Sequence, residues 1–282
     1  MKIDARSERL IRMALEEDLG PGDVTTDSTV PEAHRSSAAL IARQRGVVAG
    51  LDVALRVFRE LDSGVELETI VPDGGEVGAG DRIAVVRGRT RAIISGERVA
   101  LNFLQHLSGV ATATAGLAAR LEGTSTRLLD TRKTTPGMRS LEKQAVVLGG
   151  GENHRMGLWD MALVKDNHIA AAGEIGAAVE AVRSAGAGVR VEVEVTSEEE
   201  LGQALAAGAD RVMLDNMSPS EVESCIAVAR SHSPAPEIEI SGGVTEEGLA
   251  ELAGLGADFI SVGALTHSAP ALDISLELEP GG

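Results

Sequence analysis

The chain has 282 residues, 43% of them hydrophobic, and a formal net charge of −17. This length suits one large domain or two modest ones, and the apolar content is ample for a filled core. The negative charge disfavours a nucleic-acid surface, and a chain with no tyrosine, one tryptophan and three phenylalanines has few stacking platforms for bases. A small-molecule ligand is therefore expected, and no nucleic-acid partner.

The only cysteine is Cys225, which excludes an internal disulfide and a cysteine-based zinc cluster. A lone cysteine in a helix-like pattern suits a reducing cytoplasm, which is the expected location. No run of about 18 apolar residues occurs, and the first residues contain no apolar signal-peptide core. Neither export nor membrane insertion is expected.

The first 120 residues predict a mixed or antiparallel sheet with helices. Strands are expected at 37–42, 45–49, 65–71 and 82–89, and helices at 4–18, 50–61 and near 96–120. Arg98 would then lie in the first turn of the long helix, where the helix dipole disfavours a cation. Either Arg98 is simply solvated or it is directed toward an anion.

From residue 126 the pattern changes to short apolar strands that alternate with amphipathic helices. The strands are expected at 127–130, 161–165, 189–195, 211–215, 237–241 and 258–263, and the helices at 138–147, 174–184, 197–207, 219–230 and 246–255. This alternation predicts a parallel sheet, closed or incomplete as a barrel, with functional groups at the carboxyl ends of the strands.

Residues 130–168 concentrate positive charge in an acidic chain. The cations and histidines of this stretch are Arg132, Lys133, Arg139, Lys143, His154, Arg155, Lys165 and His168. Solvated surface positions are the usual place for such residues. However, Thr131-Arg132-Lys133 and the run 165–168 each follow directly on an apolar strand, so we interpret the stretch as an anion site.

Carboxylates and glycines end the remaining strands. Glu192 and Glu194 alternate with valines and so lie on the same side of their strand, although a solvated edge-strand pair is an alternative. Asp215 ends the next strand, and two carboxylates facing a basic cluster suit a sugar phosphate. Glycine loops at 241–243 and 263–264 favour a phosphate, although a lone S-G-G is more often a plain turn. His267 has either a packing or a ligand role.

Taken together, D-T-R-K-T-T-P-G-M-R, G-G-G-E-N-H-R-M-G-L, K-D-N-H-I, V-E-V-E-V, L-D-N-M and I-S-G-G-V resemble the quinolinate phosphoribosyltransferase family over practically the whole chain. The resemblance implies an α/β protein with an N-terminal α/β sandwich domain at 1–110, which the tail 270–282 is expected to join. It also implies an incomplete, seven-stranded α/β barrel at 111–269. Gln144 and Val147-Leu148 depart from the expected pattern before the triple glycine.

The implied reaction transfers the phosphoribosyl group of phosphoribosyl pyrophosphate to quinolinate with decarboxylation. The products are nicotinate mononucleotide, pyrophosphate and carbon dioxide, a step of de novo NAD synthesis. Mg²⁺ is expected to bind mainly through phosphoribosyl pyrophosphate, with no direct protein ligand assigned. The resemblance further implies a homodimer with composite active sites, to which Arg98 contributes across the interface, with higher oligomers left open.

By resemblance, Lys133, Lys165, Glu194 and Asp215 are the expected catalytic residues. The expected substrate-binding residues are Arg98, Thr131, Arg132, Lys133, His154, Arg155, Lys165, Glu194, Asp215, Ser241, Gly242, Gly243, Val262, Gly263, Ala264 and His267. Two alternatives stay open. One is a paralogous phosphoribosyltransferase-like protein associated with molybdenum transport, and the other is a non-enzymatic barrel that binds sugar phosphates.

Overall fold

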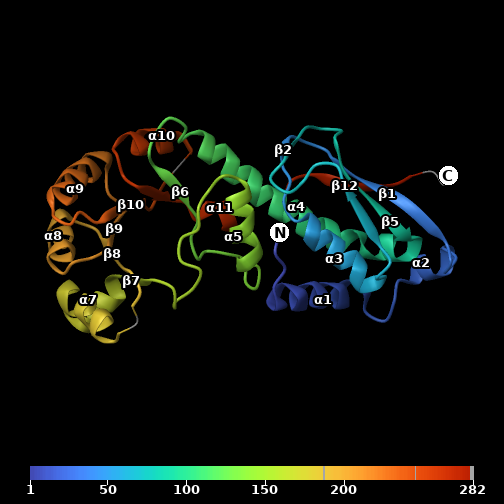
Figure 1. Cartoon of the computed structure of the whole chain (residues 1–282), viewed down its shortest axis with the longest axis horizontal. Helices are drawn as coiled ribbons and strands as arrows, with labels where there is room; N and C mark the ends of the chain where they lie inside the picture. The colour runs from blue at the N-terminus through green and yellow to red at the C-terminus, as the bar shows by residue number, and fades with distance from the viewer. Residues whose placement is uncertain (187, 245, 280–282) are drawn as a thin grey trace. The chain divides into compact units, whose positions relative to one another are not determined.

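The computed structural model describes residues 1–186, 188–244 and 246–279. They form two compact units, whose elements are labelled in Figure 1. The first unit comprises Met1–Ala115, Lys133–Gly150 and Ala264–Gly282, and the second comprises Gly116–Arg132 and Gly151–Gly263. Each unit is built around a sheet of its own, as the expected α/β class requires. No helix in the described part of the chain is long and apolar enough to cross a membrane.

The first unit contains an antiparallel sheet of four strands in the order β12-β1-β5-β3. The strands are β1 (Arg35–Ala42), β3 (Glu66–Thr69), β5 (Arg82–Arg89) and β12 (Ile274–Leu278), and a separate pair is formed by β2 (Gly46–Val47) and β4 (Glu76–Val77). The tail thus returns to this sheet, because Ala38 to Ala42 of β1 pair with Leu278 to Ile274 of β12.

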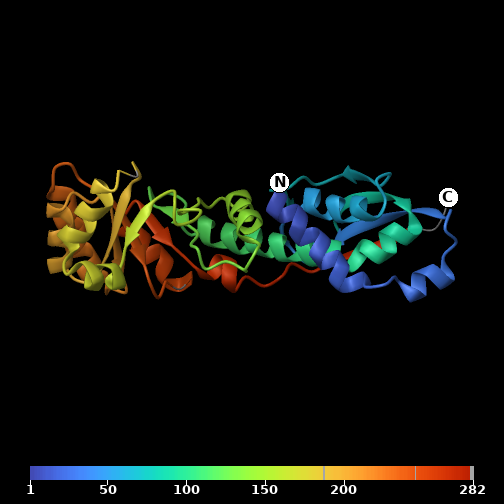
Figure 2. The same cartoon turned by 90° about the horizontal axis from the view of Figure 1, so that it is seen from below.

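The helices of this unit are α1 (Ala5–Leu19), α2 (Val24–Thr29), α3 (Leu51–Leu61), α5 (Arg139–Leu148), α11 (Ala264–His267) and most of α4 (Thr90–Ala119). Asp4 caps α1 by accepting the N–H groups of Arg6 and Ser7, and α1 lies alongside α3 in Figure 2. The buried residues of α3, among them Val57 and Phe58, pack into the core of the unit.

The long helix α4 begins at Thr90, six residues before the predicted start. Arg98 is therefore its ninth residue, and the dipole argument based on a first-turn position is wrong. The strand β5 continues into α4 without a turn residue, so Ser95-Gly96 resembled a helix start. Gly96 is instead an interior contact, since a Cβ there would lie 2.9 Å from the Phe58 ring. The sequence also gave no indication of α2, α11, β4 or β12.

The second unit contains a parallel sheet in the order β6-β11-β10-β9-β8-β7. Its strands are β6 (Arg127–Leu129), β7 (Ala162–Val164), β8 (Val191–Val195), β9 (Arg211–Asp215), β10 (Glu237–Ser241) and β11 (Phe259–Ser261). Seven strands were expected; among the described residues six are extended, and the seventh place holds a single parallel bridge between Leu129 and Glu152. The strands curl into an incomplete barrel.

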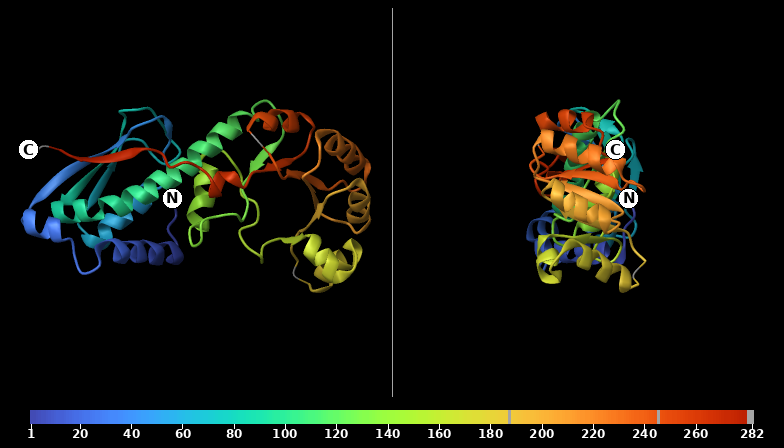
Figure 3. Two further views of the ribbon diagram at one scale, coloured as in Figure 1. Left: turned by 180° about the vertical axis from the view of Figure 1, so that it is seen from behind. Right: turned by 90° about the vertical axis from the view of Figure 1, so that its left-hand side faces the viewer.

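The barrel's helices lie outside the sheet in Figures 1 and 3. They are α6 (Asp166–Ala172), which was not predicted, α7 (Ile175–Ser184), α8 (Glu198–Ala206), α9 (Pro219–Ser231) and α10 (Glu246–Gly254). The valines of β8 are fully buried. Glu192, Arg211 and Glu239 alternate with such apolar residues and are also buried, so the inside of the sheet contains charged groups. Burying charges carries a desolvation penalty, which points to a role beyond packing.

Candidate active site

Polar side chains gather at the carboxyl edge of the parallel sheet in the second unit. Lys165 follows β7, Glu194 lies near the end of β8, and Asp215 ends β9. Because β7, β8 and β9 are adjacent and parallel, these three residues share one edge. Lys165 Nζ and Glu194 Oε2 form an ion pair in which the Glu194 side chain is 13% exposed. The structure rules out the solvated edge-strand interpretation of Glu192 and Glu194.

The ends of β9 and β10 are joined by a close backbone contact. The Asn216 N–H donates to the Ser241 carbonyl at 3.0 Å, and the Asn216 Nδ2 group donates to Asp215 Oδ2 at 2.8 Å. Gly242 has φ +87°, and a Cβ there would lie 2.4 Å from Asn216 Oδ1. Glycine is required at this position on both grounds. The Gly242 turn thus positions Asp215 through Asn216.

The proposed phosphate loops differ in what the structure shows of them. The first loop, 241–243, precedes α10, which begins at Glu246 as predicted, and Thr245 between them lies outside the described residues. In the second loop, the Val262 N–H donates to the Leu129 carbonyl at 3.0 Å. That N–H is used by the sheet, so backbone contact with a phosphate would fall to neighbouring groups.

Two guanidinium groups form the cationic part of the edge. Arg132 follows β6, and Arg155 follows the bridge residue Glu152. Burial, followed by the positive charge of Arg132, lowers the pKa of Arg155 from its usual value. The Arg155 Nη1 group donates to the Met161 carbonyl at 3.2 Å. Two cations on neighbouring segments of one sheet edge favour an anion that can contact both.

His154 lies behind the two arginines and is 8% exposed. Its backbone N–H donates to Asp130 Oδ1 at 2.8 Å, and its Nδ1 accepts the Arg155 N–H at 2.7 Å. The Nε2 atom lies 2.9 Å from Glu192 Oε2 and 3.3 Å from Glu239 Oε2. These two contacts are close but poorly aligned for hydrogen bonds. His154 therefore links two buried carboxylates to the backbone of Arg155.

The buried cluster of Glu192, His154 and Glu239 retains a proton at neutral pH. Burial alone would lower the pKa of His154, but Glu192 and Glu239 together raise it to about 9. Burial, and then the charge of Glu239, raises the pKa of Glu192 to about 7. Nδ1 accepts a backbone N–H, so Nε2 carries the proton of the ring, and the raised pKa of about 9 belongs to the cluster as a whole rather than to the ring alone. We therefore place the retained proton mainly between the carboxylates and Nε2.

Arg211 provides the positive charge beneath this cluster. Its Nη1 lies 3.4 Å from Glu239 Oε2, and its Nε and Nη2 donate to Glu237 Oε2 at 3.0 and 2.7 Å. The guanidinium also lies over the Phe259 ring, 4.1 Å from its centre. Burial opposes the ionisation of Glu239, but His154, and after it Ser261 and Arg211, lower the pKa of Glu239 below its usual value.

Sequence reasoning missed Glu239 and Arg211 and left Glu192 without a role. The available signal was the period-two pattern of 237–241, which places Glu239 on the same side of β10 as Ser241. Asp130 was predicted only as the last residue of the strand 127–130, and it is fully buried.

The remaining predicted site residues belong to the first unit or make local contacts. Lys133 is exposed in the first unit, and its carbonyl accepts the Thr266 hydroxyl at 2.8 Å. His267 is exposed with Nδ1 at 2.6 Å from Ser268 Oγ, so a local contact is what the structure shows for it. Two other cations of the 130–168 stretch lie within the first unit. Arg139 Nε donates to Thr134 Oγ1 at 3.0 Å, and Lys143 is fully buried in α5.

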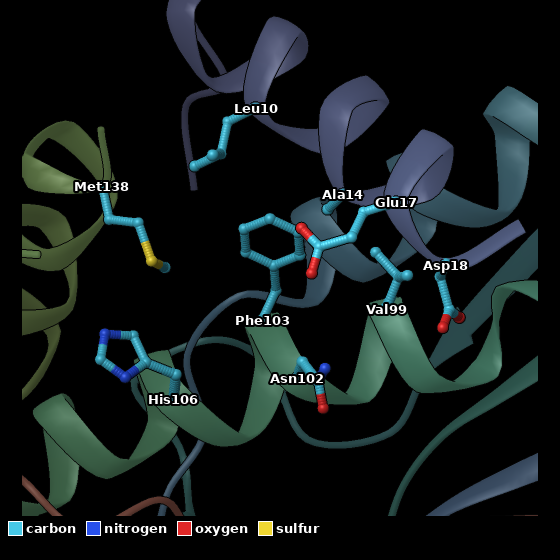
Figure 4. Close-up of a pocket in the computed structure, with 9 residues that line it drawn as sticks. All are labelled: Leu10, Ala14, Glu17, Asp18, Val99, Asn102, Phe103, His106 and Met138. Atoms are coloured by element: carbon cyan, nitrogen blue, oxygen red, sulfur yellow. The ribbon is translucent and has the colours of Figure 1, made fainter. Parts of the chain in front are cut away.

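The first unit contains a hollow of about 370 Å³ between α1, α4 and Met138. Figure 4 shows Phe103 and His106 of α4 facing Leu10 and Met138. The polar part of its lining includes Glu17 and Asp18, and no lysine or arginine lines it. His106 Nε2 lies 2.7 Å from the buried Glu142 Oε1. This acidic lining does not suit a dianion, in contrast to the edge that carries Arg132 and Arg155.

An α/β barrel whose carboxyl edge combines paired cations with carboxylates and glycine turns defines a class of anion-binding barrel proteins. Comparison with known proteins makes the family specific. The model of the quinolinate phosphoribosyl transferase N-terminal domain matches residues 23–108, and that of the C-terminal domain matches residues 110–277. The chain belongs to the quinolinate phosphoribosyl transferase family.

The similarity to individual relatives extends over nearly the full length of this chain. The chain is 42% identical to the carboxylating nicotinate-nucleotide pyrophosphorylase of Mycobacterium leprae, over 95% of each chain. It is 40% identical to a decarboxylating quinolinate phosphoribosyltransferase of Nicotiana glauca, over 96% of this chain and 81% of that one. The solved structure of the Francisella tularensis nicotinate-nucleotide pyrophosphorylase matches with a TM-score of 0.90 at 40% identity, covering 97% of this chain and 96% of that one.

Proposed function

We propose that this protein transfers the phosphoribosyl group of phosphoribosyl pyrophosphate to quinolinate with decarboxylation, giving nicotinate mononucleotide, carbon dioxide and pyrophosphate. The observation that carries the proposal is that Arg132 and Arg155 each lie three residues beyond a bridged pair, Leu129 and Glu152, at the sheet edge that also carries the Lys165–Glu194 ion pair. One part of the edge suits a dicarboxylate, and the other suits a hydroxylated sugar. The relatives' names describe this reaction.

The arginine pair explains how a dianion would be held. Quinolinate carries two adjacent carboxylates, and each guanidinium offers a planar fork of donors. Burial first, and then the positive charge of Arg132, lower the pKa of Arg155, so the charged form of Arg155 would gain from an anion bound at this edge. A dianion would supply the opposing charge on binding. The same contacts would fix the ring nitrogen toward the anomeric carbon of the second substrate.

The Lys165–Glu194 pair and Asp215 suit the sugar side. As pyrophosphate leaves, the ribose acquires positive charge, which carboxylates at Glu194 and Asp215 would stabilise. Lys165, paired with Glu194, is positioned to contact a substrate carboxylate with the remaining donors of its ammonium group. Magnesium would enter as part of the phosphoribosyl pyrophosphate complex, since diphosphate oxygens are suitable ligands, and it would neutralise charge on the leaving group.

We also propose a homodimer in which Arg98 of one subunit serves the site of the other. Arg98 is exposed on α4, and within the described ranges its side chain makes no ion pair or hydrogen bond. An unpaired exposed cation on a chain of net charge −17 is available to an anion on another molecule. A reducing cytoplasm suits the single cysteine, Cys225, which is buried.

The test is an assay with quinolinate labelled in its 2-carboxylate. Labelled carbon dioxide and pyrophosphate should form in equal amounts, and only when both substrates and magnesium are present. Nicotinate, which has one carboxylate, is the matched control and should be a poor substrate. Pyrophosphate release that does not depend on quinolinate would favour the paralogue linked to molybdenum transport. Binding of sugar phosphates without any release would favour the non-enzymatic barrel.

A further inference from the structure

The buried charges inside the barrel lie one layer behind the proposed substrate groups. Glu192 and Glu239 are fully buried, and both approach Nε2 of His154, at 2.9 and 3.3 Å. Neither carboxylate reaches the exposed sheet edge. Yet two buried carboxylates beside an imidazole are costly, and a group of apolar residues would fill the same space more favourably. Their presence calls for an explanation in terms of the site.

His154 transmits the position of this cluster to both arginines. Through Nδ1 it accepts the Arg155 N–H at 2.7 Å, and through its own N–H it bonds Asp130 at 2.8 Å. Asp130 lies two residues before Arg132 in the same loop. A rotation of the His154 ring would release the Arg155 backbone, and a shift of its backbone would move the Arg132 loop. The orientation of the His154 ring is fixed by the two carboxylates at Nε2, those of Glu192 and Glu239.

Arg211 anchors the other end of the cluster. It contacts Glu239, is held by Glu237 and lies over the Phe259 ring, so its guanidinium has several fixed contacts. Glu239 is thereby placed between a fixed cation and the His154 ring. The chain of contacts runs from Arg211 through Glu239 and His154 to Arg155, on elements that are far apart in sequence.

We propose that Glu192 and Glu239, anchored by Arg211, are positioning residues that act through His154 to hold Arg155 beside Arg132 for a dicarboxylate substrate. This inference rests on the proposed function. It assigns to the buried carboxylates a role in dicarboxylate affinity that is separate from contact with either substrate. It also gives His154 an inward role, because both ring nitrogens face groups of the protein itself.

The test compares Glu192→Gln and Glu239→Gln with the control Glu180→Gln. Glu180 is exposed on α7 and accepts the Ser184 hydroxyl. Calorimetric affinity for quinolinate should fall about tenfold in each of the first two variants, as expected when one buried polar partner is altered. Affinity for phosphoribosyl pyrophosphate should stay within about twofold, and the control should match the wild type in both.

A double-mutant cycle tests whether the effect passes through Arg155. In an Arg155→Ala background, Glu239→Gln should add little further loss of quinolinate affinity, because the group it positions is gone. Two histidine variants separate the two ring contacts. His154→Asn places an acceptor near the Nδ1 position, whereas His154→Gln places its amide near Nε2. The asparagine variant should retain more quinolinate affinity than the glutamine variant.

Several results would overturn the inference. Additive losses in the cycle would show that Glu239 does not act through Arg155. Equal losses for both substrates, accompanied by a lower Tm, would leave the carboxylates a purely structural role. A stoichiometric divalent metal in the purified protein that is lost in Glu239→Gln would replace the proton arrangement with a metal site. If the wild type itself does not turn over quinolinate, the proposed function fails instead.

Discussion

At the scale of single residues, Lys165 is the side chain whose loss we expect to be most damaging to turnover. Lys165→Ala leaves the Glu194 carboxylate, which is largely buried, without its ion-pair partner. It also leaves the substrate carboxylate that Lys165 would contact unpaired in the closed site, where loss of one partner of a charge pair costs about 3 kcal/mol, so kcat/KM for quinolinate should fall about a hundredfold. Steady-state kinetics measures this, with Arg183→Ala as a control that removes an exposed ion pair to Asp210. Near-wild-type kcat/KM in Lys165→Ala would exclude the proposed role.

Replacing Glu194 or Asp215 should impair the use of phosphoribosyl pyrophosphate more than the binding of quinolinate. Glu194→Gln and Asp215→Asn keep the shapes of the side chains but remove the charges that would stabilise the ribose in the transition state. We expect phosphoribosyl pyrophosphate affinity and kcat to fall at least about tenfold, while quinolinate affinity changes by about twofold or less. Calorimetry with each substrate separately decides this, and losses of equal size for both substrates would contradict the assignment.

The buried cluster predicts that stability falls in alkaline solution. In the folded protein the pKa of His154 is raised to about 9 and that of Glu192 to about 7, so the folded state holds a proton that the unfolded chain has released. The contribution of His154 is complete below the unfolded histidine pKa of about 6.5 and is lost as pH rises to about 9, whereas that of Glu192 is lost between about 4.5 and about 7. The groups facing the cluster are Asp130, Arg155 and Arg211.

Urea unfolding between pH 6.5 and 9.5 measures this loss, which we expect to be on the order of 2 kcal/mol. The double variant Glu192→Gln, Glu239→Gln should show a flatter dependence, because neither carboxylate can then hold the proton. His232→Gln replaces an exposed histidine and should keep the wild-type slope. A wild-type slope in the double variant would mean that the cluster is not the source.

At the scale of elements, the turn after β10 sets the position of the end of β9. Gly242→Ala places a methyl group 2.4 Å from Asn216 Oδ1 and also strains a backbone at φ +87°. The strain alone costs roughly 1–2 kcal/mol, and the clash should also displace Asn216 and the bonded Asp215. We expect reduced affinity for phosphoribosyl pyrophosphate, measured by calorimetry.

Gly208→Ala is the matched control for this turn. Gly208 has φ +72°, but a Cβ there would meet nothing within 4 Å. It should therefore lower Tm through backbone strain without changing substrate affinity. If the two variants have the same effect on phosphoribosyl pyrophosphate binding, the contact between Gly242 and Asn216 does not position the site.

At the scale of the whole molecule, the proposed dimer makes a testable claim about shared sites. Arg98→Ala and Lys165→Ala proteins should each be nearly inactive. When mixed and allowed to exchange subunits, they should recover up to about a quarter of wild-type activity, because about half the dimers are mixed and each mixed dimer has one intact site. Mass spectrometry monitors the exchange. Complete exchange without recovery would show that Arg98 does not act in the partner's site.

The sequence by itself determined the class of fold and the edge where the site lies. Strand-helix alternation after residue 126 predicted the parallel sheet, and the described β9 and β10 have the predicted bounds, 211–215 and 237–241. Local patterns suffice here because a strand with one apolar side and flanking turn residues has few alternatives. The motifs also indicated the family to which the chain belongs. The predicted domain boundaries and the individual roles of the site residues stay predictions.

Only the tertiary structure decided where α4 begins and which groups lie behind the site. The start of α4 has no capping residue that the sequence could reveal. Ser95-Gly96 resembles a helix start, but Gly96 lies inside α4 and contacts Phe58 of another helix, which only the tertiary structure shows. Likewise, the contacts of His154 with Glu192 and Glu239 join residues on three distant segments. Sequence periodicity shows that Glu239 faces inward, but its partner depends on strand order. That order is fixed by packing of the whole sheet, and a local pattern does not contain it.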